Sequence, residues 1–177
     1  MASPHLPPLT LVLGGARSGK SRHAEALVEG SGLACHYLAT GTPGDGEMAA
    51  RIEAHQARRG AHWVLHEAPL ALATTLAAVA APDRAVLVDC LTLWLTNLMV
   101  AEHDLDAATV DLLAGLERTR GPVVFVSNEV GQGVVPMNAM ARRFVDQAGM
   151  LHQRLGAVAD RVDLVTAGLP LTLKSPG

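Results

Sequence analysis

A glycine-rich octapeptide near the amino end restricts the fold of this chain more than any other feature. Residues 14–21 read GGARSGKS and satisfy the pattern G-x-x-x-x-G-K-[ST]. The octapeptide follows a short apolar run, Leu9–Gly14, and precedes a helix-forming segment, Lys20–Gly30. A phosphate-binding loop needs this order, because backbone N–H groups and the amino terminus of a helix must face the same anion. The sequence therefore predicts an α/β domain that binds a nucleoside triphosphate.

The residues of this loop have expected roles at the phosphates. Lys20 is expected to reach the outer phosphates and to act in catalysis, and the Ser21 hydroxyl is expected to bind Mg²⁺. A glycine-rich turn that matches the pattern by chance is the alternative, and the flanking strand and helix argue against it. The predicted nucleotide contacts in the loop are Gly14, Gly15, Ala16, Arg17, Ser18, Gly19, Lys20 and Ser21.

The rest of the chain alternates between apolar runs and helix-forming segments. The predicted strands besides Leu9–Gly14 are Ala34–Ala39, Trp63–His66, Ala85–Val88, Pro122–Val126 and Asp163–Thr166. The predicted helical segments are Lys20–Gly30, Gly46–Arg59, Leu70–Ala81, Leu91–Arg120 and Asn138–Ala159. This alternation favours a mostly parallel central sheet flanked by helices. A length of 177 residues suits one domain, expected over residues 9–177 after a flexible, proline-rich tail of residues 1–8.

Composition and charge exclude several classes of protein. The net charge of −3 gives no cationic field for a phosphate backbone, so we expect no nucleic-acid partner. The longest apolar stretches, Pro69–Pro82 and Leu91–Ala101, are shorter than the roughly 20 residues of a membrane span. The first residues do not resemble a secretory signal, and Cys35 and Cys90 form no metal-binding spacing. We therefore expect a cytoplasmic protein.

Acidic residues follow two of the predicted strands. Asp89 comes directly after the run AVLV and is expected to contact the nucleotide and its Mg²⁺. Its alternative role is to cap the helix that begins near Leu91. Glu129 comes after the strand that ends near Ser127 and is a candidate general base or water-orienting residue. Its alternative is a plain turn formed with Gly131 and Gly133.

A histidine lies among arginines in the predicted helix Gly46–Arg59. Arg51, His55, Arg58 and Arg59 share one helical face, because they are spaced at i−4, i, i+3 and i+4. The guanidinium group of one arginine can bind two phosphate oxygens at once. Nearby positive charge lowers the pKa of an imidazole and so keeps it neutral and nucleophilic. This face predicts a histidine that takes up a nucleotidyl group, and an exposed basic helix with an incidental histidine is the alternative.

Four blocks in order make the chain similar to a known family. The blocks are GGARSGKS (14–21), RIEAHQARR (51–59), VDCLTLWLTNLM (88–99) and SNEVGQGVVP (127–136), and the closing AGLPLTLK (167–174) adds to them. They resemble the bifunctional adenosylcobinamide kinase / adenosylcobinamide-phosphate guanylyltransferase family. The resemblance runs from about Leu9 to the carboxyl end.

The resemblance implies a RecA-like, single-domain fold and two activities in cobalamin biosynthesis. Adenosylcobinamide would be phosphorylated by ATP or GTP, and GMP would then pass from GTP to adenosylcobinamide-phosphate through a guanylylated His55, with Mg²⁺ present. It further implies a homotrimer and a nucleotide contact at Glu67. The family usually has a second acid after that glutamate, and this chain has Ala68 there, so a contact made by the second acid is in doubt.

Two other functions fit parts of the sequence. A phosphate-loop kinase acting on another small alcohol would leave His55 incidental, and it would form no covalent nucleotide adduct. A RecA-like nucleotide switch or nucleic-acid motor would be retained on single-stranded DNA, although the acidic net charge disfavours it.

Overall fold

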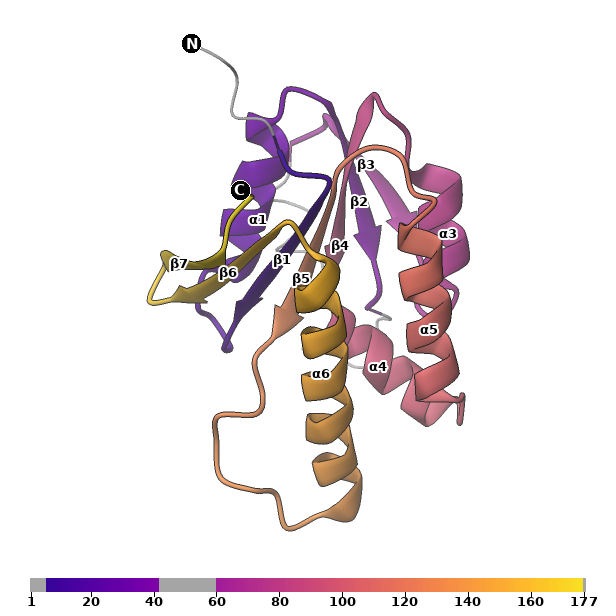
Figure 1. The fold of residues 1–177 in the computed structure, drawn as a ribbon, viewed down its shortest axis with the longest axis vertical. Helices are drawn as coiled ribbons and strands as arrows, with labels where there is room; N and C mark the ends of the chain where they lie inside the picture. Colours follow the sequence, from indigo (N-terminus) through magenta and orange to yellow (C-terminus); the bar gives the residue numbers. More distant parts are fainter. Residues whose placement is uncertain (1–5, 42–59, 177) are drawn as a thin grey trace.

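The computed structural model describes residues 6–41 and 60–176, which form one seven-stranded sheet with helices on both faces (Figure 1). The strands are β1 (Leu9–Gly14), β2 (Ala34–Ala39), β3 (Trp63–Glu67), β4 (Arg84–Asp89), β5 (Val123–Asn128), β6 (Arg161–Thr166) and β7 (Leu169–Lys174). The helices are α1 (Lys20–Gly30), α3 (Leu72–Val79), α4 (Leu91–Val100), α5 (Leu105–Leu116) and α6 (Ala139–Val158).

The strand order is β3-β2-β4-β5-β1-β6-β7. All neighbouring pairs are parallel except β6 and β7, which are antiparallel. This arrangement confirms the predicted α/β fold with a mostly parallel sheet. The first strand of the chain lies inside the sheet, between β5 and β6. The loop that follows β1 therefore has neighbouring strand ends on both sides.

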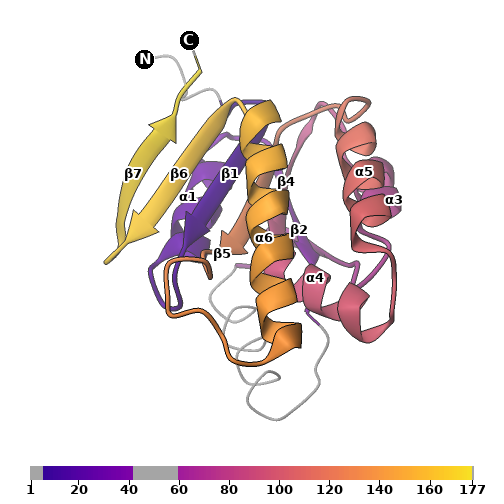
Figure 2. The same cartoon turned by 60° about the horizontal axis from the view of Figure 1, so that its bottom comes forward.

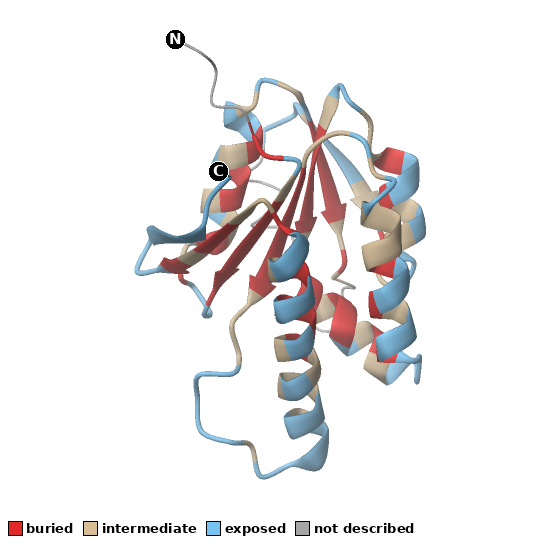
Figure 3. Ribbon diagram, in the orientation of Figure 1, coloured by how far each residue is buried: buried red, intermediate tan, exposed pale blue. Residues whose placement is uncertain are grey.

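The inner strands β1, β2, β4, β5 and β6 are mostly buried because helices cover both faces of the sheet, whereas the edge strands β3 and β7 are largely exposed (Figures 2 and 3). Alternate residues of β5 belong to two different core clusters, with Phe125 on the side of α3, α4, α5 and α6 and Val124 on the side of α1. This two-sided burial is why the strands appear in the sequence as continuous apolar runs rather than as alternating patterns. In the described part of the chain, no helix combines the length and the hydropathy needed to cross a bilayer.

The structure corrects two predicted elements. The segment Leu91–Arg120 forms two helices, because Glu102 takes a left-handed conformation (φ 56°) and the Asp104 carboxylate caps a new helix at the Ala107 N–H. The carboxyl-terminal strand β7 was not predicted. It pairs with β6 through a turn in which Ala167 and Gly168 both have positive φ, a geometry typical of two-residue hairpins.

The residues just before β1 contact the rest of the domain. The side chain of Leu6 is buried, and the Pro8 carbonyl accepts a hydrogen bond from the Val123 N–H. Leu6 and Pro8, which belong to the predicted tail of residues 1–8, therefore contact the domain. The predicted helix Gly46–Arg59 lies outside the described residues.

Gly121, just before β5, lets the backbone pass close to the carbonyl groups of Ala81 and Arg84. Gly121 has φ +91°, and a Cβ there would overlap the carbonyl group of Ala81 and lie 3.0 Å from the Arg84 carbonyl oxygen. We expect Gly121→Ala to lower the free energy of unfolding by about 2–4 kcal/mol, because left-handed strain and overpacking add. Urea denaturation measures the change.

Gly149, which lies inside α6, is the matched control. A Cβ at Gly149 meets no atom within 4 Å, so Gly149→Ala should raise the free energy of unfolding by about 0.5–1 kcal/mol through helix propensity. Equal effects of the two substitutions would contradict the steric explanation at Gly121.

Candidate functional site

The site is built on the carboxyl ends of three neighbouring strands. Gly14 at the end of β1 pairs with Asn128 at the end of β5, and Val126 of β5 pairs with Asp89 at the end of β4. Since adjacent strands are about 4.8 Å apart, the backbones of β1 and β4 lie roughly 10 Å from each other. The parallel sheet therefore places the glycine-rich loop, an amide and a carboxylate in one row, at the edge where ligands bind in this class of fold.

The glycine-rich loop has a tight conformation that depends on its small residues. The Ser18 N–H donates to the Gly15 carbonyl at 3.3 Å, and Gly19 has φ +95° at the start of α1. A Cβ at Gly14 would lie 2.7 Å from the Val165 carbonyl oxygen and would collide with the Ser18 hydroxyl. Gly14 is therefore required by close packing and Gly19 by its backbone angle.

Lys20 folds back over the loop. Its Nζ donates to the Gly15 carbonyl at 3.0 Å, and the residue is buried. Burial lowers the pKa of Lys20, and the Asp89 carboxylate acts in the opposite direction. A buried ammonium group is stabilised by an anion, so this position favours the binding of phosphate oxygens.

Asp89 has a carboxylate oxygen without a partner. Its Oδ2 atom is buried and forms no hydrogen bond within the described residues. Helix α4 begins after Cys90 and has no side-chain cap, so the alternative role of Asp89 as a helix cap is wrong. A buried carboxylate oxygen without a donor carries a desolvation cost, and a bound cation would offset it.

A buried threonine holds the backbone next to Asp89. The Thr40 hydroxyl donates to the Cys90 carbonyl at 2.7 Å and accepts from the Cys90 N–H at 2.9 Å. Asn97 then donates to the Thr40 carbonyl at 2.7 Å. Thr40 and Asn97 were not identified from the sequence, because neither falls in a motif that the spacing alone reveals.

Cys90 is unreactive in this environment. Burial and the neighbouring Asp89 raise the pKa of its thiol to about 11. At neutral pH the thiol therefore stays protonated and is a poor nucleophile.

Oxygen ligands suitable for Mg²⁺ come from the end of β4 and from the first turn of α1. Asp89 Oδ2 is available at β4, and Ser21 is the half-buried second residue of α1, next to Lys20. Mg²⁺ binds proteins through one or two such oxygens and keeps several waters and phosphate oxygens as its other ligands. The donor set present here fits that ion.

Glu129 follows β5 at the same edge. Its N–H donates to the Gly14 carbonyl at 3.0 Å, which ties it to the start of the loop. Its Oε1 accepts a hydrogen bond from the Gly131 N–H at 2.7 Å, so the carboxylate also closes the turn. Both predicted roles of Glu129, as a base near the site and as a turn residue, are compatible with this position.

A hydrogen bond fixes the side chain of Asn128 at the end of β5. Its amide donates to the Thr92 hydroxyl at 2.8 Å. Thr92 is buried on the first turn of α4. The end of β5 is therefore connected to the helix that follows Asp89.

Glu67 lies at the same edge but farther along the sheet. It ends β3 and pairs with Ala39 of β2, which on its other side pairs with Asp89. Glu67 is exposed, whereas the neighbouring Ala68 is buried in the core. Glu67 is therefore separated from the phosphate loop by β2, β4 and β5, and a contact with the nucleotide would be to a part remote from the phosphates.

The predicted nucleophile and its arginines are not part of this geometry. His55, Arg51, Arg58 and Arg59 lie outside the described residues. The last described residue before them is Gly41, which follows β2 directly after Thr40. The Thr40 N–H donates to the Asp89 carbonyl at 3.3 Å, so Thr40 lies next to the row of strand ends.

The chain is similar to known proteins along nearly its whole length. A family model described as cobinamide kinase / cobinamide phosphate guanyltransferase matches residues 10–173. The chain is 54% identical over 166 residues to the bifunctional adenosylcobalamin biosynthesis protein CobP of Pseudomonas aeruginosa, covering 93% of this chain and 96% of that protein. It is 44% identical over 181 residues to the bifunctional adenosylcobalamin biosynthesis protein CobU of Salmonella typhimurium, covering 94% and 99%.

Solved structures with low sequence identity share the fold. The flagellar accessory protein FlaH from Methanocaldococcus jannaschii has a TM-score of 0.55 at 11% identity, covering 97% of this chain and 80% of that chain. An ATPase from a bacterial type III secretion system has a TM-score of 0.57 at 14% identity, covering 94% and 57%. These likenesses concern the architecture alone, which is that of RecA-like ATPases.

The unpartnered carboxylate at the end of β4 leads to a prediction. Asp89→Asn should weaken Mg²⁺-dependent binding of GTP about tenfold, because the amide keeps the shape but loses the charge that favours the cation. Titration of GTP at several Mg²⁺ concentrations measures the effect.

Asp83→Asn is the matched control, since Asp83 is exposed and lies 3.6 Å from Arg84 at the opposite end of β4. This control should leave the Mg²⁺ dependence unchanged. An Asp89→Asn protein with normal Mg²⁺ dependence would exclude Asp89 as a metal-binding residue.

Proposed function

Because this chain belongs to the cobinamide kinase / cobinamide phosphate guanyltransferase family, we propose that its one phosphate loop serves two successive reactions on the same corrinoid. The chain is a bifunctional enzyme of cobalamin biosynthesis, with a kinase and a guanylyltransferase activity. The first reaction phosphorylates adenosylcobinamide, and the second attaches GMP to the phosphate formed in the first. The loop at residues 14–21, between β1 and α1, is the observation that carries this proposal.

In the kinase reaction the aminopropanol hydroxyl of adenosylcobinamide attacks the γ-phosphorus of ATP or GTP. A P–O bond to the γ-phosphorus forms, the bond to the bridging β–γ oxygen breaks, and a nucleoside diphosphate leaves. Lys20 and the loop N–H groups bind the phosphates. Glu129 accepts the hydroxyl proton in this proposal, which its attachment to Gly14 at the site edge supports.

The guanylyltransferase reaction proceeds in two steps. A nitrogen of His55 attacks the α-phosphorus of GTP, the bond to the bridging α–β oxygen breaks, and pyrophosphate leaves. A phosphate oxygen of adenosylcobinamide-phosphate then attacks the same phosphorus and breaks the P–N bond, which gives adenosylcobinamide-GDP and frees His55. The neutral imidazole avoids bringing two anions together in the first step, and Arg51, Arg58 and Arg59 stabilise the charge on the transferred group.

Mg²⁺ would be held by Ser21 and Asp89, and when bound it neutralises charge on the phosphate oxygens. The buried, unpartnered Oδ2 of Asp89 supports this. Glu67 is proposed to contact the nucleotide away from its phosphates. The two cysteines are free, which fits the reducing cytoplasm that we propose as the location of the enzyme.

Two variants distinguish the nucleophile from the phosphate loop. His55→Ala should abolish the covalent GMP adduct and guanylyl transfer but keep phosphorylation of adenosylcobinamide, because the hydroxyl attacks the γ-phosphorus without a carrier. Lys20→Ala should reduce both activities by about 100-fold or more, since both triphosphates use one loop. The measurement is incubation with GTP labelled at the α-phosphate, followed by denaturation and peptide mapping, alongside a kinase assay.

The chemistry of the adduct is the control. A phosphoramidate on imidazole is stable to alkali and labile to acid. A phosphoester on serine does not show this combination. An adduct that persists in His55→Ala would place the nucleophile elsewhere. If the unmodified enzyme forms no adduct with GTP, the proposed covalent intermediate on His55 is wrong, and the alternative in which His55 is incidental is favoured. Normal kinase turnover in Lys20→Ala would contradict the shared loop.

We also propose that the enzyme is a homotrimer, as the family resemblance implies. Two exposed apolar segments support an association of copies. One is the loop before α6, in which Val134 is 96% exposed and Met137 is 98% exposed. The other is the edge strand β7, where Leu169 and Leu171 are also exposed. Several exposed apolar side chains close together in sequence are typical of surfaces that become covered by a partner.

Light scattering coupled to size-exclusion chromatography tests the trimer. The expected mass is three times the 18.5 kDa of one chain. Met137→Glu should shift the protein toward smaller species, because a carboxylate is costly to bury in an apolar contact. Val110→Glu, at an exposed position on α5, is the control and should leave the mass unchanged. A monomeric wild-type protein would contradict the proposal.

A further inference from the structure

The β6–β7 hairpin contacts the phosphate loop from outside the site. The Gly168 N–H, in the turn between β6 and β7, donates to the Ser18 carbonyl at 2.8 Å. The Gly168 Cα would lie 3.1 Å from a Cβ at Gly19, so the turn packs closely against the backbone of the loop. At the other end of the loop, a Cβ at Gly14 would lie 2.7 Å from the Val165 carbonyl oxygen. The hairpin therefore packs against the loop at Gly14 and at Ser18 and Gly19.

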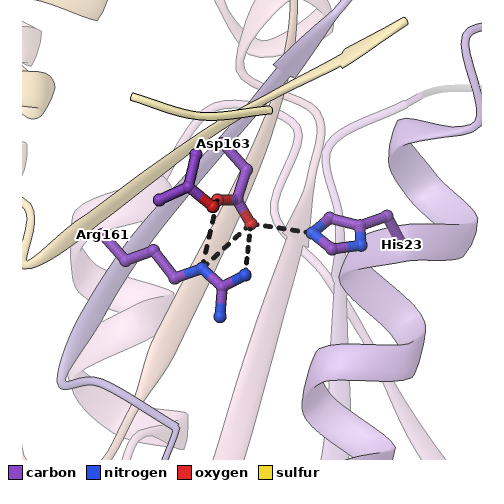
Figure 4. Close-up of polar contacts among 4 residues, drawn as sticks. His23, Arg161 and Asp163 are labelled. Carbon is purple, nitrogen blue, oxygen red and sulfur yellow. Dashed lines mark hydrogen bonds and ion pairs between the residues drawn. The ribbon is translucent and has the colours of Figure 1, made fainter. Parts of the chain in front are cut away.

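A buried carboxylate connects this hairpin to α1. Asp163 of β6 is fully buried and accepts hydrogen bonds from three elements, as Figure 4 shows. The partners are Arg161 Nε at 3.0 and 3.1 Å and Nη2 at 2.9 Å, Thr172 Oγ1 at 2.8 Å, and His23 Nε2 at 2.8 Å. Burial acts to raise the pKa of Asp163, but these hydrogen bonds hold it below its ordinary value. The carboxylate is therefore charged and tightly held.

Two partners of Asp163 lie in elements next to the phosphate loop: the helix that follows the loop and the hairpin that contacts it. His23 is three residues after Lys20, so its contact with Asp163 fixes the first turn of α1. Thr172 lies in β7, four residues after Gly168, so its contact fixes the strand that follows the turn. Asp163 thus determines where α1 and the hairpin turn lie relative to each other, and the loop is held between them.

We propose that Asp163 is a positioning residue for nucleotide binding, acting through His23 and Thr172 to keep the phosphate loop in its anion-binding conformation. The loop binds phosphates through backbone N–H groups, whose directions change if α1 or the hairpin shifts. The inference rests on the proposed function only in that the loop binds a triphosphate. In this proposal, side chains behind the loop support nucleotide binding without touching the nucleotide.

Substitutions at His23 and Thr172 test this role. His23→Leu removes one donor to Asp163, His23→Gln keeps an N–H donor, and Thr172→Val removes the hydroxyl with little change in shape. We expect the Kd for Mg²⁺–GTP to rise about tenfold in His23→Leu and Thr172→Val, equivalent to ~1.4 kcal/mol, and to recover in His23→Gln. Hydrogen exchange at residues 14–19 should become faster in the same two variants.

Glu29→Gln is the control, because Glu29 pairs with His62 at 3.2 Å at the other end of the same helix. It should leave the Kd and the exchange of the loop unchanged. All measurements are made at a temperature where circular dichroism shows each variant to be folded. Thr172→Val, the smaller change, decides the question if His23→Leu does not fold.

Two results would separate the failure of this inference from the failure of the proposed function. Variants that melt at lower temperature but keep the wild-type Kd and the wild-type exchange at residues 14–19 would show a structural role only, and the inference would be wrong. A wild-type enzyme that does not bind Mg²⁺–GTP would instead contradict the proposed function.

Discussion

The parallel pairing of β1, β5 and β4 is the constraint on which the rest of the site depends. Their carboxyl ends bring the loop after Gly14 into one row with Asn128 and Asp89. Two-sided burial holds these strands in register, because Phe125 and Val124 of the middle strand pack into opposite core clusters. A shift of one residue would exchange the two faces and move each functional residue away from the others. The hydrophobic core therefore sets the geometry of the phosphate site.

Much of this fold could be predicted from the sequence, because the parallel strands are continuous apolar runs. The strand β7 was missed because all of its residues, Leu169–Lys174, are exposed, so no buried apolar run marks it, and because it contains a proline. The break between α4 and α5 was missed because no glycine or proline marks it. The left-handed residue there is Glu102, a type that gives no local signal for such a turn.

The positions of the glycine-rich loop between β1 and α1 and of Asp89 at the end of β4 could be predicted, because they depend on local order along the chain. Thr40 and the partners of Asp163 could not, since they act through contacts between residues far apart in sequence. Asp163 and His23 are separated by 140 residues and meet only because β6 lies next to β1. The spacing of residues in one sequence reveals motifs on a single loop or helix. The contacts of Asp163 with His23 and Thr172 depend instead on the completed sheet.

The place of β1 in the middle of the sheet has a consequence for the order in which the protein is made. Ribosomes release β1 first, but its two neighbours, β5 and β6, begin at Val123 and Arg161. The first strand must therefore wait for the last third of the chain before it is paired on both sides, and such distant contacts slow folding. A nascent chain carries the complete glycine-rich motif long before it has a supported phosphate loop. Competence to bind nucleotide thus arises only after β6 has been made.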